Sequence, residues 1–353
     1  MASKMKKILL VSNHVFHYRQ KVYNYFFDAF QKDGFEFHVL SDSYQKVDWK
    51  NNYIQHEAPF SILGYCKQIK EIKPDVVILF LHLKDKIMIP IIYYCKLHHI
   101  PVIYWNHGIN LETPDDRIKN AAFHFVHNRC DALITYTPEM KRYFTEKNQN
   151  KLFVAYNTLN LSDIKKDELP SKEETKLKYG IKENKVILYI SRLMPYKRPE
   201  LVIEAFGGEA DIAVVIVGPG ISDSIQKRVD HFDNVYYLGE KYGAEVDAIY
   251  KMGDVFSTPG HIGLAMNQAL FWGLPIVILE GRHAPEIYYM KDGKTGYLAK
   301  DAEDYKQKIL KLFCDDKLLK QMSQNCLDVY EHEVSIDRMY EGFMEAINYC
   351  LKK

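Results

Sequence analysis

The sequence lacks a strong net charge, a cysteine motif and a long apolar run. Its 353 residues contain 47 Lys and Arg against 46 Asp and Glu, so the net charge is only +1 and no global field attracts nucleic acid. The six cysteines are scattered without a Cys-x-x-Cys pair. This pattern favours reduced thiols in a cytoplasmic protein over disulfides or a cysteine–zinc site. The apolar stretches 76–81 and 87–95 are far shorter than the roughly 20 residues of a membrane span, and the N-terminus does not read as a signal peptide.

Short β-branched and aromatic runs alternate with amphipathic stretches along most of the chain. Such alternation is typical of βαβ units in an α/β fold. We predict two doubly wound, Rossmann-like domains at 1–163 and 185–334, with a deep interdomain cleft where strand ends would bind a ligand. The charged segment 164–184 reads as a linker with a short solvent-facing helix. The last helix, 335–353, is amphipathic and is expected to pack back toward the N-terminal domain.

A pair of cations follows a predicted buried strand in "ILYISRLMPYKRPELVIEAF", residues 187–206. Arg192 and Lys197 would project from the carboxyl edge of the sheet, and Pro199 would open the next helix. Two cations beside a helix start can clamp a diphosphate. A solvated basic surface is the alternative, but the position at a strand end favours the site.

Neighbouring loops at the same predicted edge carry glycines and few charges. Gly218 and Pro219 lie in a Gly-Pro-Gly turn, which can approach a ligand closely or serve only as a turn. Residues 257–277 contain no charged side chain, yet backbone N–H groups at 262–265 could hold an anion or a sugar oxygen. Glu286 follows Pro285 and can either cap a helix start or bind hydroxyls.

Histidines follow several predicted strands of the first half, at His14, His17, His82 and His107. Four at one sheet edge indicate a polar pocket. His14/His17 and the pair at 124 and 127 also have a spacing compatible with metal binding. No carboxylate or cysteine completes either set, so we predict no metal site.

The motifs together resemble retaining glycosyltransferases of the GT-B fold, in the large group called glycosyl transferases group 1 or family 4. The resemblance is carried by "SRLMPYKRPELVIEAF", "VGPG", "NVYYLG", "GLAMNQALFWGLPIV" and "DGKTGYL" in the second half. The first half agrees more loosely through "HYRQKVYNYF", "WNHG" and "VAYNTLN". The resemblance spans nearly the whole chain.

The resemblance implies roles for individual residues. Arg192 and Lys197 would bind the donor diphosphate and stabilise its charge as the sugar departs, and His107 would lie near the sugar and the reacting carbon. The expected donor-binding residues are Gly218, Pro219, Leu238, Tyr242, His261, Gly263, Leu264, Gln268 and Glu286. The expected acceptor-side residues are His17, Tyr18, Arg19 and His82.

The chain departs from the family pattern in the uncharged stretch. Family members commonly carry two glutamates here, separated by seven residues, and the alignment puts Gly260 and Gln268 at these positions. Gln268 can still bond ribose hydroxyls, whereas contacts at position 260 must come from the backbone or from His261. Attack of the acceptor on the face that the leaving group vacates mainly needs positioned diphosphate charge. Activity without the acids is therefore expected.

The resemblance implies a cytoplasmic, metal-independent, hexosyltransferase-like enzyme. It would move a sugar from a nucleotide diphosphate, with a UDP-sugar favoured, to a glycan or lipid-linked acceptor in cell-surface polysaccharide or glycoconjugate synthesis. No cofactor beyond this co-substrate and no nucleic-acid partner is expected. Peripheral membrane contact through Lys4, Lys6 and Lys7 stays open against a solvated surface. The alternatives are a nucleotide-sugar epimerase on the same fold and a non-catalytic nucleotide- or glycan-binding subunit.

Overall fold

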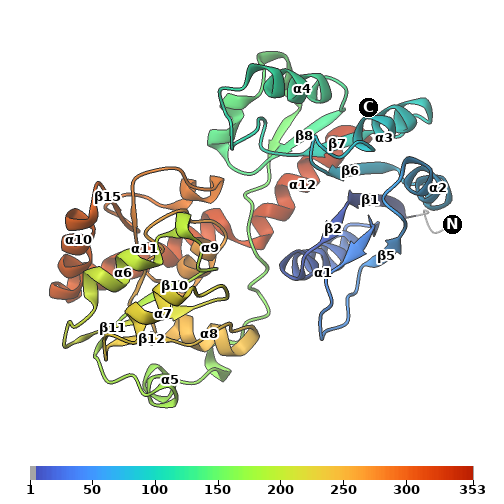
Figure 1. The fold of residues 1–353 in the computed structure, drawn as a ribbon. Coiled ribbons are helices and arrows are strands. Elements are labelled where there is room, and N and C mark those ends of the chain that lie inside the picture. Colours follow the sequence, from blue (N-terminus) through green and yellow to red (C-terminus); the bar gives the residue numbers. More distant parts are fainter. Residues whose placement is uncertain (1–4, 353) are drawn as a thin grey trace. The chain divides into compact units, whose positions relative to one another are not determined.

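The computed structural model describes residues 5–352, and the chain divides into two compact units (Figure 1). The N-terminal unit comprises residues 1–160 together with 335–353, and the C-terminal unit comprises 161–334. Each unit contains its own parallel sheet with helices packed on it. Lys4, one of the lysines considered for lipid contact, lies outside the described residues.

The N-terminal unit is built on a seven-stranded parallel sheet in the order β5-β3-β1-β6-β7-β8-β9. Aliphatic runs buried on both faces form its central strands, as parallel sheets require. A separate two-stranded ribbon pairs β2 with β4. The strands are β1 (Lys6–Ser12), β2 (His14–Val15), β3 (Phe35–Ser41), β4 (Ser43–Tyr44), β5 (Ile54–Glu57), β6 (Val76–Phe80), β7 (Val102–Trp105), β8 (Ala132–Thr135) and β9 (Leu152–Val154).

Helices cover both faces of this sheet. Ile8 and Leu10 of β1 face a core completed by α1 (His17–Lys32) and α12 (Ile336–Leu351). Leu9 and Val11 face the opposite core, because successive strand residues alternate in direction. That second core is closed by α2 (Ile62–Ile72), α3 (Met88–Leu97) and α4 (Arg117–His127), while the 3-10 helices η1 (Pro138–Tyr143) and η2 (Glu146–Lys151) connect β8 to β9.

The C-terminal unit is built on a six-stranded parallel sheet in the order β12-β11-β10-β13-β14-β15. Its strands are β10 (Lys185–Ile190), β11 (Ile212–Val217), β12 (Val235–Tyr237), β13 (Val255–Phe256), β14 (Ile276–Leu279) and β15 (Gly296–Ala299). The α-helices are α5 (Lys172–Tyr179), α6 (Pro199–Phe206), α7 (Asp223–Val229), α8 (Gly243–Met252), α9 (Ala265–Phe271), α10 (Ala302–Cys314) and α11 (Asp316–Val329). Shorter turns are η3 (Lys166–Glu168), η4 (Pro195–Lys197), η5 (Pro285–Tyr289) and the π-helical η6 (Tyr330–Val334). The predicted fold class, two Rossmann-like α/β domains, is confirmed.

Two segments mark how the chain passes between the units. The expected linker, 164–184, is part of the C-terminal unit, because α5 packs on α8 there. The chain re-enters the N-terminal unit at residue 335, and α12 lies against its sheet, with Phe343 edge-on to Trp105 at 5.0 Å. A Cβ at Gly342 would lie 2.1 Å from the carbonyl oxygen of Val154, so only glycine lets α12 approach β9 this closely.

Several features bear on the function classes considered above. Among the described residues, no cysteine forms a disulfide bond. Within residues 5–352, no helix has the length and apolar character of a membrane span. Across the same part of the chain, no three or more His, Cys, Asp or Glu side chains gather in a way that could hold a metal ion.

Candidate active site

The predicted cation pair lies in the loop that follows β10. Arg192 is exposed, whereas Lys197 is half-buried and its Nζ donates to the backbone carbonyl of His261 at 3.0 Å. Burial and, secondarily, the charge of Arg192 lower the pKa of Lys197 to about 8. Neither Arg192 nor Lys197 forms an ion pair within the described chain. Arg198, in the same loop, does pair with Glu200, at 3.8 Å. The loop therefore presents two neighbouring cations whose charges are not compensated by a carboxylate.

Gly260 joins this basic loop to the loop after β13. Its N–H donates to the carbonyl of Lys197 at 3.1 Å, and the N–H of His261 donates to the carbonyl of Tyr196 at 3.1 Å. A Cβ at position 260 would lie 2.2 Å from the Tyr196 oxygen and 2.7 Å from the Lys197 Cα. No side chain fits here without moving the basic loop. Gly260 thus makes a close backbone contact that sets the position of Lys197.

His261 follows directly and is half-buried next to Lys197. Its ring lies edge-on to Tyr196 at 5.8 Å, and its Nδ1 is buried without a hydrogen-bond partner among the described residues. Burial, and after it the charges of Lys197 and His283, lower the pKa of His261. The ring is therefore neutral at pH 7, when one of its nitrogens can accept a hydrogen bond from a hydroxyl.

His283 holds the neighbouring loops together. It accepts a hydrogen bond at Nδ1 from the N–H of Ile262 at 3.3 Å and donates from Nε2 to the carbonyl of Leu279 at 2.9 Å. These two contacts fix one neutral tautomer, and burial also lowers the pKa of His283. The N–H of Ile262, one of the backbone donors expected to face a ligand, is therefore already used. Gly263 and Leu264 follow as the approach to α9, which has no side-chain cap at Leu264.

Gln268 on α9 contacts a buried acid that the sequence analysis missed. Its Nε2 donates to Oδ1 of Asp247 on α8 at 2.8 Å. The contact joins residues 21 positions apart, and no motif around Asp247 signals it. A glutamate at 268 would place a second carboxylate against that of Asp247, which like-charge repulsion disfavours. An amide suits this position, because its NH₂ group donates to Asp247 while its carbonyl oxygen can accept a further hydrogen bond.

Gly218 has a structural role in bringing three strand ends together. Its N–H donates to the carbonyl of Gly239 at 2.9 Å, and its own carbonyl accepts from the Tyr237 hydroxyl at 2.9 Å. With φ at +138° and only 2.1 Å between a built Cβ and the Ser191 oxygen, glycine is required. The turn thus supports the residue that precedes Arg192.

The other predicted donor residues lie around these loops. Pro219 accepts from the N–H of Leu193, and Leu238 follows β12 and donates to Ile216. Tyr242 is exposed at the start of α8 and its hydroxyl bonds to Glu240. Glu286 is buried in the first turn of η5.

His82 and His107 line a cavity of about 360 Å³ in the N-terminal unit, together with Asn106 and Tyr136. The His107 ring stacks on Tyr136 at 4.1 Å. Burial, then the charges of Arg19 and His82, lower the pKa of His107 to about 4. The imidazole is therefore neutral at physiological pH.

The remaining N-terminal candidates lie on or beside α1. His17 bonds through Nδ1 to Gln45 at 3.0 Å, and His14 bonds through Nδ1 to Ser43 at 2.8 Å. Tyr18 is half-buried and Arg19 is buried. The histidines that the sequence groups together thus separate: two line the cavity, and two bond to polar side chains near the β2–β4 ribbon.

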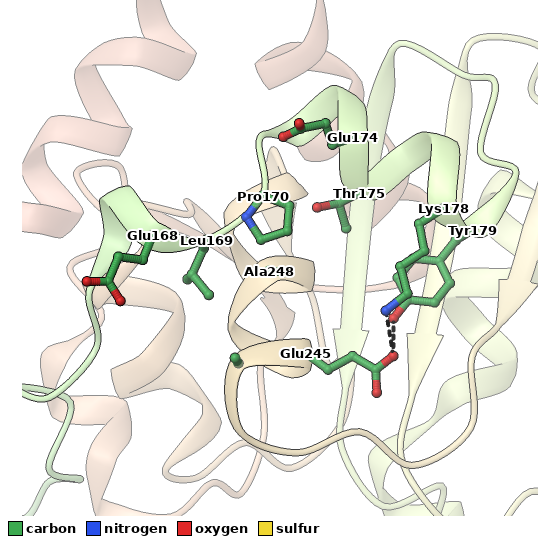
Figure 2. Close-up of a pocket in the computed structure, with 10 residues that line it drawn as sticks. Glu168, Leu169, Pro170, Glu174, Thr175, Lys178, Tyr179, Glu245 and Ala248 are labelled. Atoms are coloured by element: carbon green, nitrogen blue, oxygen red, sulfur yellow. Dashed lines mark hydrogen bonds and ion pairs between the residues drawn. The ribbon is translucent and has the colours of Figure 1, made fainter.

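A larger cavity of about 650 Å³ lies between α5 and α8, and Figure 2 shows its lining. There Glu245 accepts hydrogen bonds from Lys178 at 2.9 Å and from the Tyr179 hydroxyl at 2.8 Å. None of the predicted donor residues lines it. Because Lys178, the one cation drawn there, is paired with Glu245, we do not place the chemistry in this cavity.

Comparison with known proteins agrees with the two-unit architecture. The family described as Glycosyltransferase Family 4 matches residues 22–163, and Glycosyl transferases group 1 matches residues 171–327. Trehalose synthase of Pyrococcus horikoshii is 23% identical over 69% of this chain, which spans only 63% of that protein. The processive diacylglycerol beta-glucosyltransferase of Bacillus pumilus is 22% identical over 91% of this chain and 90% of its own length.

Among solved structures, HepE of Anabaena in complex with UDP has a TM-score of 0.77 at 13% identity, covering 98% of this chain and 100% of that one. This likeness shows the fold. The two family matches and the shared fold support the assignment of the chain to the GT-B glycosyltransferase family.

Proposed function

We propose that the chain is a retaining glycosyltransferase that transfers a hexosyl group from a UDP-sugar to a glycan or lipid-linked acceptor. The observation that carries the proposal is the cation pair Arg192 and Lys197, which has no carboxylate partner within residues 5–352 and lies on a loop fixed by Gly260. A cationic lysine with a lowered pKa is costly unless an anion binds it, so the loop is suited to a diphosphate. The UDP complex of the HepE neighbour supports a uridine nucleotide as the donor.

The chemistry follows from where charge develops. As the bond between the sugar carbon and the diphosphate oxygen breaks, negative charge grows on the diphosphate, and Arg192 and Lys197 stabilise it. These side-chain cations can supply the charge that a metal ion supplies elsewhere, so the proposed reaction is independent of metal. The acceptor oxygen bonds to the same face of the sugar carbon and passes its proton to the departing phosphate oxygen. This route needs no carboxylate at position 260.

The remaining residues would orient the donor and its sugar. We assign Gln268 to the ribose and His261 to a sugar hydroxyl, since each offers a neutral hydrogen-bonding group. The family resemblance assigns neutral His107 to the sugar near the reacting carbon. We place the reaction in the cytoplasm, in cell-surface polysaccharide or glycoconjugate synthesis, and the scattered cysteines, which include no Cys-x-x-Cys pair, favour a reducing compartment.

The experiment is incubation of the purified protein with UDP-glucose, UDP-galactose or UDP-N-acetylglucosamine and a panel of glycan and lipid-linked acceptors, followed by proton NMR. We expect a glycoside with the anomeric configuration of the donor, formed only when acceptor is present. An isomerised donor in the absence of acceptor would instead establish an epimerase. Binding of UDP without transfer to any acceptor would favour a non-catalytic subunit, and a product with the opposite anomeric configuration would refute retention.

A further inference from the structure

Arg19, near the start of α1, is a buried cation that has no carboxylate partner in the described part of the chain. Arg19 is only 4% exposed to solvent, and its Nη2 donates a hydrogen bond to Oδ1 of Asn157 at 2.8 Å. Its Nε and Nη1 have no hydrogen-bond partner among the described residues, and no ion pair involves it there. Arginine is seldom buried this fully unless an anion pairs with it.

The surroundings of Arg19 supply aromatic rings and further unused donors. The guanidinium carbon lies 4.7 Å from the ring centre of Trp105 and 5.4 Å from that of Phe80, which gives partial compensation through cation–π contact. The indole Nε1 of Trp105 and the hydroxyl of Thr137 are also buried without hydrogen-bond partners among residues 5–352. Three side chains from α1 and the ends of β7 and β8 thus leave N–H or O–H groups unused. Unsatisfied buried donors are costly and call for an explanation.

An accessible space adjoins this cluster. Phe80 and Trp105, the two stacked rings beneath the guanidinium, are both in the wall of the 360 Å³ cavity that His82 and His107 also line. The charge of Arg19 acts on His107, since it contributes to lowering the pKa of that ring. The one carboxylate in the wall, Glu112, is exposed. The cavity therefore has aromatic walls, and the cation Arg19 lies against two of them, Phe80 and Trp105, without itself lining the cavity.

We propose that Arg19 is the anion-binding residue of an acceptor subsite, so that the acceptor carries a carboxylate or phosphate group beside its sugar or glycerol moiety. Oxyanions match the fork of N–H donors on a guanidinium, and sugar faces pack on aromatic rings. The assignment of this anion to the acceptor rests on the proposed glycosyltransferase function. The anion site itself rests only on residues of the N-terminal unit.

The test uses matched pairs of small probes that differ in charge. Binding of glucuronate against glucose, and of glycerol 3-phosphate against glycerol, is measured by NMR titration on the full chain. We expect the anionic member of at least one pair to bind and its neutral partner not to bind at the same concentration. Response to glucuronate alone identifies a carboxylate acceptor, and response to glycerol 3-phosphate alone identifies a phosphate acceptor.

Variants assign the binding to Arg19. Arg19→Met should weaken binding of the anionic probe by about tenfold or more, because a charge-assisted hydrogen-bonded pair is lost. Arg129→Met is the matched control, because Arg129 already donates to the Tyr93 hydroxyl and the Phe125 carbonyl, neither of which lines the cavity. Arg19→Lys keeps the positive charge but loses the forked N–H donors of the guanidinium, so it should retain part of the affinity for the anionic probe.

Stability and donor binding separate this role from a structural one. Arg19→Met should melt no lower than the wild type, since it removes an unpaired buried charge, and it should bind UDP as the wild type does. Unchanged anion binding in both Arg19 variants, or no anion binding by the wild type, would overturn the inference. A large loss of stability in Arg19→Met, combined with full anion binding in Arg19→Lys, would also overturn the inference, because Arg19 would then have only a structural role. Anion binding without any UDP binding would refute the donor proposal and leave the anion site standing.

Discussion

Replacement of Gly260 by glutamate, which would restore the acid of the family pattern, is predicted to damage the protein rather than to activate it. A Cβ there would lie 2.2 Å from the Tyr196 oxygen and 2.7 Å from the Lys197 Cα, both backbone atoms that cannot swing away. Relief of the overlap must separate the two loops and break the hydrogen bonds from Gly260 to Lys197 and from His261 to Tyr196.

The magnitude follows from those losses. Each backbone bond contributes about 1 kcal/mol net, and overpacking typically costs 1–3 kcal/mol. Gly260→Ala, the smallest test, should therefore lower the free energy of unfolding by about 3–5 kcal/mol. For a unit of this size that corresponds to a fall in melting temperature of roughly 6–20 °C.

Differential scanning calorimetry and UDP titration calorimetry check this prediction. Gly263→Ala is the control for stability, because a Cβ there meets only the Cβ of Ala284, at an ordinary 3.7 Å. Gly260→Ala and Gly260→Glu should both melt lower than Gly263→Ala and bind UDP more weakly than the wild type. A Gly260→Glu protein with the melting temperature of the wild type and increased transfer would refute the steric argument.

Three further predictions concern titration and charge. The pKa of Lys197 is lowered to about 8, so UDP affinity measured by calorimetry should fall as the pH rises from 7 to 9 and the ammonium loses its proton; affinity that does not change across this range contradicts the assigned role. Gln268→Glu should lower the melting temperature through repulsion from Asp247, and Asp247→Asn should relieve that loss in the double variant; independent, additive effects would show that the two carboxylates do not interact. The pKa of His107 is about 4 because of burial and the nearby charge of Arg19, so its NMR signals should stay constant between pH 5.5 and 8, and Arg19→Met should raise that pKa; a midpoint near 6.5 in the wild type would contradict the buried site.

Local sequence patterns predicted the architecture because most strands of the two sheets are runs of β-branched and aromatic residues, whereas the short β2 and β4 and the polar β5 show no such pattern. The run Lys185–Ile190 is aliphatic and buried, and its position before Arg192 placed the cations at a strand end from the sequence alone. The helix at Lys172–Tyr179 also carries a readable signal, the capping box of Ser171 and Glu174. The packing of this helix on α8 could not be predicted from its own sequence, because charged residues dominate its composition.

Local sequence patterns do not reveal the tertiary contacts that shape the candidate site. The family resemblance predicts a glutamate at position 260, but the role of Gly260 depends on the backbone at Tyr196, 64 residues earlier. The hydrogen bond between Gln268 and Asp247 likewise depends on how α9 meets α8. Arg19 was assigned to the acceptor side by resemblance, whereas its burial without a carboxylate follows only from the assembled core around Trp105. Such tertiary contacts leave no periodic pattern in the sequence.

The central claim is that Arg192 and Lys197 bind the donor diphosphate, and titration calorimetry of UDP and uridine against matched variants tests it most directly. Arg198 is the control, because it lies in the same loop but pairs with Glu200. Arg192→Met and Lys197→Met should each weaken UDP binding by about tenfold or more, the value of a charge-assisted contact, and leave uridine binding unchanged. Arg198→Met should bind UDP as the wild type does. Equal UDP affinity in all three variants and the wild type would contradict the account.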